Sequence, residues 1–105
     1  MGNEKHYSAH FLSDADEYIK SLTNVEQGTI AADVRYMQKG EFDLVYTKRL
    51  RGAVRELISG RHRVTYFLSG FGLYFVRGFK KQSGKTPKRE IDYAIGVLKR
   101  FKEGA

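Results

Sequence analysis

Polar and apolar residues alternate over the first segment of the chain and then change to helical spacing. In residues 6–11 every second side chain is apolar or aromatic, and these side chains would share one face of an extended chain, which predicts a β-strand. A helix is expected to begin at Ser13, with Asp16 as its capping-box partner. Its apolar positions recur three and four residues apart, as a buried helix face requires: Ala15, Tyr18, Ile19 and Leu22.

A second helix is predicted directly after the first. Thr23 and Glu26 have the spacing of a capping box, and the helix is expected to end near Gly40. The apolar stripe of this helix consists of Ile30, Ala31, Val34 and Met37. Because so few residues separate the two helices, we expect them to pack together as a helical hairpin.

Beyond residue 44 the pattern becomes one of short β-like runs separated by turns. Two runs, at 44–46 and 54–58, are predicted on either side of the basic stretch 48–51. Two longer runs, at 64–68 and 73–80, are separated by turn residues. These four runs are the strands expected to form most of a sheet.

The last predicted element is a helix with Thr86 as N-cap and Pro87 at its first helical position. The chain therefore has one strand, two helices, a run of strands and one helix. This order predicts an α+β fold with an antiparallel meander and not a doubly wound parallel sheet. No linker or repeat interrupts the pattern, so residues 1–105 are expected to form a single domain.

Basic residues are concentrated in the second part of the chain. The net charge is +7, but residues 1–47 carry −4 and residues 48–105 carry +11. Between residues 48 and 89, Glu56 is the only acidic residue against twelve lysines and arginines. Such asymmetry predicts a basic face, whose usual partner is a nucleic-acid backbone. The alternative is a solvated basic surface that serves solubility.

Several kinds of chemistry are excluded or disfavoured. The chain has no Cys, which excludes disulfides, thiolate catalysis and cysteine-ligated metals. His6 and His10 would lie about 13 Å apart on a strand, too far to bind one ion, so no metal or other cofactor is expected. The tripeptide 84–86 resembles the end of a phosphate-binding P-loop, but Phe79 stands where that motif needs Gly. No apolar run approaches the ~18–20 residues of a membrane span, so we expect a cytoplasmic protein without a membrane partner.

A cationic site is predicted where Arg61 and Arg63 enter a strand, with His62 between them. Alternation should place the two arginines on one sheet face, and Lys80 and Lys81 lie across the following hairpin. Cations, an imidazole and nearby tyrosines can together bind and polarise a phosphodiester. Further basic residues expected to contact RNA are Arg51, Arg55, Arg77, Lys85 and Lys88.

The face of each residue in the last predicted strand follows from the same alternation. Arg77 should share a face with Phe75 and Phe79, whereas Lys80 should share the other face with Tyr74 and Val76. The phenylalanines of this sheet are expected to be core residues, in preference to a platform for stacked bases. They are Phe67, Phe75 and Phe79.

Four segments of the second part resemble the phage-derived HigB-like branch of the RelE/ParE toxin superfamily. They are Glu-Leu at 56–57, Arg-His-Arg-Val-Thr-Tyr-Phe at 61–67, Val-Arg-Gly-Phe-Lys-Lys at 76–81 and Lys-Thr-Pro-Lys-Arg-Glu-Ile at 85–91. The end of the third segment and the whole of the fourth are the most specific. The resemblance covers residues 44–101 closely, and the preceding elements agree with the family in pattern only.

This resemblance implies a small RelE-like α+β domain with a twisted antiparallel sheet. It also implies a toxin of a toxin–antitoxin pair. RelE and HigB members cleave mRNA without a metal, usually on the ribosome, and are held inactive by a cognate antitoxin, here expected to be a helix-turn-helix protein. ParE members share the fold but inhibit DNA gyrase, so the fold alone does not determine the function.

From the resemblance we expect a metal-independent endoribonuclease in which a ribose 2′-hydroxyl attacks the adjacent phosphate. Arg61 and Arg63 would hold the phosphate, and Lys80 and Lys81 would stabilise the charge that develops on it. His62 would act as an acid or base, because imidazole titrates near neutral pH. The alternative for His62 is a solvent-facing strand residue without a catalytic role.

One position departs from the family pattern. Members commonly have Arg directly after Glu-Leu, and this chain has Ile58 there. Arg55, Arg61 or Arg63 would then have to supply the missing charge. The alternatives are a non-catalytic gyrase inhibitor of the ParE kind, or a decayed toxin that binds RNA or its antitoxin without cleavage.

Overall fold

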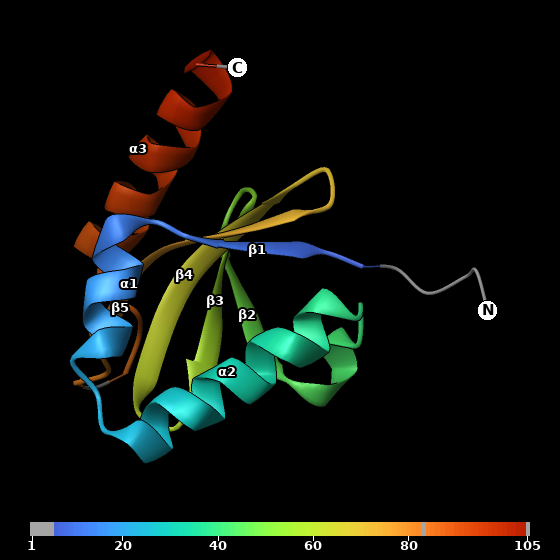
Figure 1. The fold of residues 1–105 in the computed structure, drawn as a ribbon. Helices are drawn as coiled ribbons and strands as arrows, with labels where there is room; N and C mark the ends of the chain where they lie inside the picture. The colour runs from blue at the N-terminus through green and yellow to red at the C-terminus, as the bar shows by residue number, and fades with distance from the viewer. Residues whose placement is uncertain (1–5, 83, 105) are drawn as a thin grey trace.

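The computed structural model describes residues 6–82 and 84–104. In these residues a five-stranded sheet, in the order β1-β5-β4-β3-β2, carries helices on both faces (Figure 1). The elements in chain order are β1 (Ser8–Phe11), α1 (Ser13–Lys20), α2 (Asn24–Gln38), the 3-10 turn η1 (Phe42–Leu44), β2 (Tyr46–Arg51), β3 (Val54–Ser59), β4 (His62–Ser69), β5 (Gly72–Lys80) and α3 (Lys88–Gly104).

The strands confirm the α+β class and most of the predicted topology. Strands β2 to β5 form an antiparallel meander. Strand β1 differs, because it lies parallel to β5 at the edge of the sheet, with Ser8 opposite Gly72 and Phe11 opposite Phe75. The sheet is therefore mixed: α1 and α2 carry the chain from this edge to the far edge, where β2 begins.

The basic stretch 48–51 lies within β2 and not between two strands as predicted. Leu44, which was expected to begin a strand, is the last residue of η1. Strand β2 is an edge strand with mostly exposed side chains, and charged residues on such edges protect the sheet from pairing with other chains. For this reason the strand lacks the apolar alternation by which it could have been recognised.

The sheet buries an apolar core on each of its two faces. We call them the α1–α2 face and the α3 face, after the helices that cover them. The core of the α1–α2 face includes Ala15, Ile30, Val34, Met37, Val45, Leu57, Val64, Tyr66, Leu73 and Phe75. The core of the α3 face includes Val54, Phe67, Val76, Ala94 and Leu98.

The two N-terminal helices are held mainly by the sheet. Helix α1 packs against β5, where the ring of Tyr18 lies directly over Gly78. Helix α2 packs against η1, β1 and β3 and runs across the lower end of the sheet in Figure 1. The predicted helical hairpin is therefore not confirmed.

The ends of the first two helices explain why one capping prediction holds and the other fails. In α2 the capping box is complete: the Glu26 N–H donates to Thr23 Oγ1 at 3.2 Å, and the Thr23 N–H donates to Glu26 Oε1 at 3.0 Å. In α1, Ser13 is already helical and Leu12 takes the N-cap position without a side-chain bond. Asp16 instead pairs with Lys20.

Helix α3 begins at Lys88, later than predicted. The Pro87 carbonyl accepts the Glu90 N–H at 3.0 Å, so Pro87 precedes the helix. The Thr86 hydroxyl donates to Glu56 Oε1 on β3 at 2.7 Å, and within the described residues it accepts no N–H of α3, so it is not a cap. This bond ties the segment before α3 to the sheet at the site described next.

Candidate functional site

The predicted catalytic residues lie on opposite faces of the sheet. Arg63 pairs with Phe79 across β4 and β5, and its neighbour His62 pairs with Lys80. Since successive residues of a strand point to opposite faces, His62 and Lys80 lie on the α1–α2 face and Arg63 on the α3 face. Arg61 lies in the turn before β4 and lines a hollow with His62 and Lys80. The expectation that Arg61 and Arg63 share a face is therefore wrong.

A bulge in β5 changes the faces that alternation predicts. Thr65 lies opposite Arg77 but Tyr66 lies opposite Phe75, which leaves Val76 as the extra residue. Arg77 therefore lies on the α3 face, as Phe79 does, while Phe75 lies on the other face.

The same bulge corrects the face of Lys80. Lys80 lies on the face of Phe75 and not on the face of Tyr74 and Val76, as alternation predicts. Counting residues along the strand could not reveal this change, because the bulge is visible only in the pairing with β4.

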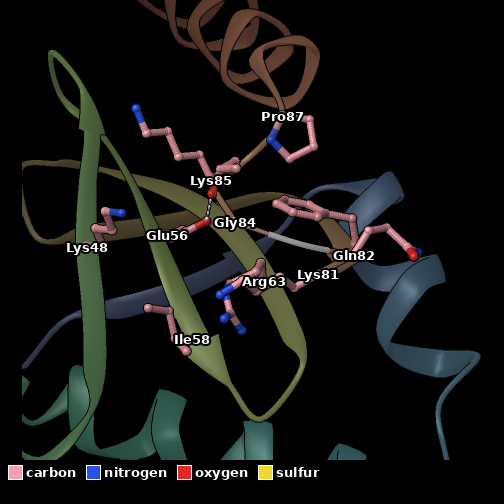
Figure 2. A pocket seen from close by; sticks show the side chains of 11 residues that line it. Lys48, Glu56, Ile58, Arg63, Lys81, Gln82, Gly84, Lys85 and Pro87 are labelled. Atoms are coloured by element: carbon pink, nitrogen blue, oxygen red, sulfur yellow. Dashed lines mark hydrogen bonds between the residues drawn. The ribbon is translucent and has the colours of Figure 1, made fainter.

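A small basic cleft of about 170 Å³ opens on the α3 face, between the sheet and the segment that leads into α3 (Figure 2). Strands β2, β3, β4 and β5 form its floor, and the segment after β5 forms one wall. We call it the basic cleft. Its lining residues are Lys48, Glu56, Ile58, Arg63, Phe79, Lys81, Gln82, Gly84, Lys85, Thr86 and Pro87.

Arg63 is the most enclosed cation of the basic cleft, with only 8% of its surface exposed. Its Nη1 donates to the carbonyls of Gly60, at 2.8 Å, and His62, at 3.1 Å. These bonds hold the guanidinium in place, and its Nε and Nη2 make no other hydrogen bond within the described residues. A fixed guanidinium with unused N–H groups is suited to bind a phosphate.

Glu56 is the only acidic side chain among the described lining residues of the basic cleft. It is 2% exposed, accepts the Thr86 hydroxyl through Oε1 and lies opposite Lys48 in the pairing of β2 with β3. Four cations line the basic cleft together with this one carboxylate: Lys48, Arg63, Lys81 and Lys85. The basic cleft has a net positive charge and also contains a group that can accept a proton.

His62 is buried on the opposite face and both of its ring nitrogens have partners. Nδ1 lies 2.7 Å from the Tyr18 hydroxyl, and Nε2 lies 2.8 Å from Glu26 Oε2. The hydrogen bond from His62 is the main reason why the pKa of Glu26 is lowered from 4.5 to about 2. His62 thus joins α1 and α2 to β4, and its interpretation as a solvent-facing residue is wrong.

Two of the residues predicted to bind RNA are engaged with α3. Arg51 forms an ion pair with Asp92 at 2.8 Å, and Asp92 also pairs with Lys88 at 2.9 Å. Both cations lower the pKa of the Asp92 carboxyl, Lys88 most strongly. These pairs connect the edge of the sheet to the first turns of the helix.

Two other predicted RNA-binding residues also have partners within the protein. Arg77 pairs with Glu90 at 3.1 Å, and its guanidinium lies 4.2 Å from the ring centre of Tyr93. Arg55 donates to the Tyr66 hydroxyl at 3.3 Å and to Thr47 Oγ1 at 3.2 Å. Lys85 is the one residue of the predicted RNA-binding set that lines the basic cleft.

The predictions for the phenylalanines have mixed outcomes. Phe67 and Phe75 are fully buried, as expected for core residues, whereas Phe79 is half-buried in the basic cleft. His10 stacks on Tyr74 with ring centres 4.6 Å apart. Within residues 6–82 and 84–104, no group of three or more His, Asp or Glu side chains could hold a metal ion.

Sequence reasoning missed Lys48 as a site residue and did not assign a role to Glu56. Lys48 lies in a strand that alternation could not detect, and only its register opposite Glu56 places it at the basic cleft. A signal for Glu56 was present, because it is the only acidic residue between residues 48 and 89, where the chain has twelve lysines and arginines.

None of the helices in the described part of the chain is long and apolar enough to cross a membrane.

The model of the family described as phage derived protein Gp49-like matches residues 17–99. The chain belongs to this family. The match includes α2, the meander, the basic cleft and most of α3, and it agrees with the RelE-superfamily resemblance found in the sequence. Among curated proteins, no sequence matches the chain.

Solved structures of RelB–RelE complexes contain chains of the same fold as this Gp49-like protein. A chain of the Mycobacterium tuberculosis RelBE2 toxin–antitoxin complex superposes with a TM-score of 0.60 at 16% identity, covering 72% of this chain and 99% of that one. A chain of the Pyrococcus horikoshii RelE–RelB complex superposes with a TM-score of 0.64 at 12% identity, and the match covers 75% of this chain and 99% of that one. A chain of the Methanococcus jannaschii RelB–RelE antitoxin–toxin complex superposes with a TM-score of 0.59 at 13% identity, and the match covers 68% of this chain and 88% of that one.

Proposed function

We propose that this Gp49-like protein is the toxin of a toxin–antitoxin pair and acts as a metal-independent endoribonuclease on mRNA. The observation that carries the proposal is the basic cleft, which four cations and one carboxylate line together over the sheet. Preorganised cations of this kind stabilise the charge that develops on a phosphate in the transition state. Family membership and the shared fold support the toxin role.

The nucleophile of the proposed reaction comes from the RNA itself. A ribose 2′-hydroxyl attacks the adjacent phosphorus, the bond from phosphorus to the 5′-oxygen breaks, and a 2′,3′-cyclic phosphate and a 5′-hydroxyl result. Arg63 and Lys81 would hold the phosphate, and Glu56 would accept the proton of the 2′-hydroxyl. A lysine ammonium or water would supply the proton for the leaving oxygen.

This assignment revises the set of catalytic residues drawn from the sequence. Arg61, His62 and Lys80 lie on the α1–α2 face, whereas Arg63 and Lys81 line the basic cleft. The two groups line separate hollows on opposite faces of the sheet, so we assign the scissile phosphate to one of them. We place the site at the basic cleft, because His62 already uses both ring nitrogens to hold the helices.

We further propose that a cognate antitoxin neutralises the protein in the cytoplasm, and that its substrate is mRNA, either free or on the ribosome. The structural neighbours support the antitoxin, because they are RelB–RelE complexes, two of them described as pairing an antitoxin with a toxin. The excess of positive charge supports an RNA partner.

The adjacent lysines Lys80 and Lys81 provide a matched test. Both are exposed, but Lys81 lines the basic cleft and Lys80 does not. We expect Lys81→Ala to lower the rate of RNA cleavage by roughly 10²–10³-fold, and Lys80→Ala to keep most of it. The measurement is cleavage of labelled RNA together with growth arrest in cells that lack the antitoxin.

Two outcomes would contradict the proposal. Loss of activity in Lys80→Ala but not in Lys81→Ala would move the site to the α1–α2 face. RNA binding without any cyclic-phosphate product would indicate a binding module, which is the function that Ile58 in place of the family arginine favours.

A further inference from the structure

An exposed aromatic residue lies beside the basic cleft. Tyr46 begins β2 and is 78% exposed, and its side chain makes no ring contact or hydrogen bond with the other described residues. Tyr46 lies opposite Ile58, and Ile58 lines the basic cleft. Paired residues of neighbouring strands have side chains on the same face, so Tyr46 belongs to the rim of the cleft on the α3 face.

The neighbours of Tyr46 combine an apolar surface with a cation. Lys48 follows two residues later on the same face of β2, about 7 Å away along the strand. Ile58, at the same rim, is where the family commonly has arginine. The apolar pair Tyr46 and Ile58 therefore stands next to a cationic cleft, an arrangement suited to a flat, apolar group attached to a phosphate.

We infer that Tyr46, backed by Ile58, stacks an unpaired RNA base next to the phosphate held in the basic cleft. This inference rests on the proposed function and adds a base subsite to it. Proteins that bind single-stranded RNA commonly combine a positively charged groove with an aromatic side chain on which a base stacks. A base can reach Tyr46 only when it is unpaired, so the subsite selects single-stranded RNA.

The charge of the basic cleft decides which partner fits this surface. An exposed tyrosine could also contact a protein, but the Lys48 and Arg63 cations that flank the subsite favour a polyanion. Any of the four bases can stack on a tyrosine ring, because each base has a π-face. Tyr46 therefore sets a preference for unpaired nucleotides and not for a particular sequence.

The test uses a nonameric 2′-O-methyl oligoribonucleotide, which cannot be cleaved because it lacks the 2′-hydroxyl. We expect Tyr46→Ala to weaken its binding by roughly 5- to 150-fold, the range found for base–aromatic stacking. Tyr46→Phe, which keeps the ring, should bind within about twofold of the unmodified protein. Tyr36→Ala is the matched control, because Tyr36 is a 40% exposed tyrosine on α2, the helix packed on the opposite face.

A series of the same oligomer with one abasic position at a time shows whether the ring contacts a base. The unmodified protein should lose affinity at one position, and Tyr46→Ala should be insensitive there. Equal affinity of Tyr46→Ala and the unmodified protein, or equal abasic profiles, would overturn the inference. A protein that shows this pattern but never cleaves natural RNA would retain the subsite and lose the proposed endoribonuclease function.

Discussion

The carboxylate of Glu26 makes three hydrogen bonds, which connect the start of α2 with the sheet. Its Oε1 accepts the Thr23 N–H and hydroxyl at the start of α2, and its Oε2 lies 2.8 Å from His62 on β4. The carboxylate therefore both begins a helix and holds it to the sheet. Each bond favours the ionised form, which is why the pKa of Glu26 falls to about 2.

This depressed pKa predicts how stability depends on acid. A carboxyl whose pKa is lower in the folded protein stabilises it above its ordinary pKa of 4.5, and that contribution is lost as the pH falls toward 2. We expect Glu26→Gln to lower the melting temperature most above pH 4.5, with a difference that shrinks progressively toward pH 2. Thermal unfolding of both proteins from pH 6 to pH 2 measures it, and a constant difference would contradict the linkage.

At the level of elements, two glycines illustrate opposite packing requirements. Gly28 lies inside α2, and a Cβ added there would meet nothing within 4 Å. Gly78 lies in β5 beneath α1, where an added Cβ would be 2.7 Å from Cγ of Tyr18 and closer still to its Cδ2. The close approach of α1 to the sheet, and with it the Tyr18–His62 bond, depends on the missing side chain at Gly78.

The two glycines should respond oppositely to the same substitution. Gly28→Ala should raise the free energy of unfolding by about 1 kcal/mol, because alanine favours a helix and has room there. Gly78→Ala should lower it by roughly 1–3 kcal/mol, because the rigid ring of Tyr18 would have to move. Urea denaturation measures both, and destabilisation by both substitutions would show that Gly28 is also packed closely.

Elements with a strong local signal were predictable, and elements determined by their neighbours were not. Thr23 and Glu26 formed their capping box because both partners lie within one helical turn. Thr86 did not cap α3, and its hydroxyl instead bonds Glu56, a residue thirty positions away. The basic strand β2 carried no apolar alternation, so its position came only from its pairing with β3.

Across the whole molecule, the sheet divides the positive charge into separate groups. One group lines the basic cleft, a second lies around Arg61 and Lys80 on the α1–α2 face, and a third is paired with acids of α3. The net charge of +7 therefore overstates the charge available to one ligand. RNA affinity should depend on the position of each lysine and not on the total.

Salt dependence tests this distribution. Each phosphate neutralised on a single strand contributes about 0.7 to the slope of log affinity against log salt. Lys85→Ala, at the basic cleft, should weaken binding of single-stranded RNA and reduce the slope by about that amount. Lys99→Ala, an equally charged exposed residue in the second half of α3, should leave the slope unchanged. Equal effects of both would indicate that the RNA contacts the protein without a defined site.

The sequence alone was sufficient for the α+β class, the meander, the presence of all three helices and the concentration of positive charge after residue 47. These features depend on residues close together in the chain or on composition. The tertiary structure decided which cations line the same cleft, because strand register and the β5 bulge place Arg63 and Lys81 apart from His62 and Lys80. Register arises from contacts between distant strands, and a shift of one residue moves a side chain to the other face of the sheet.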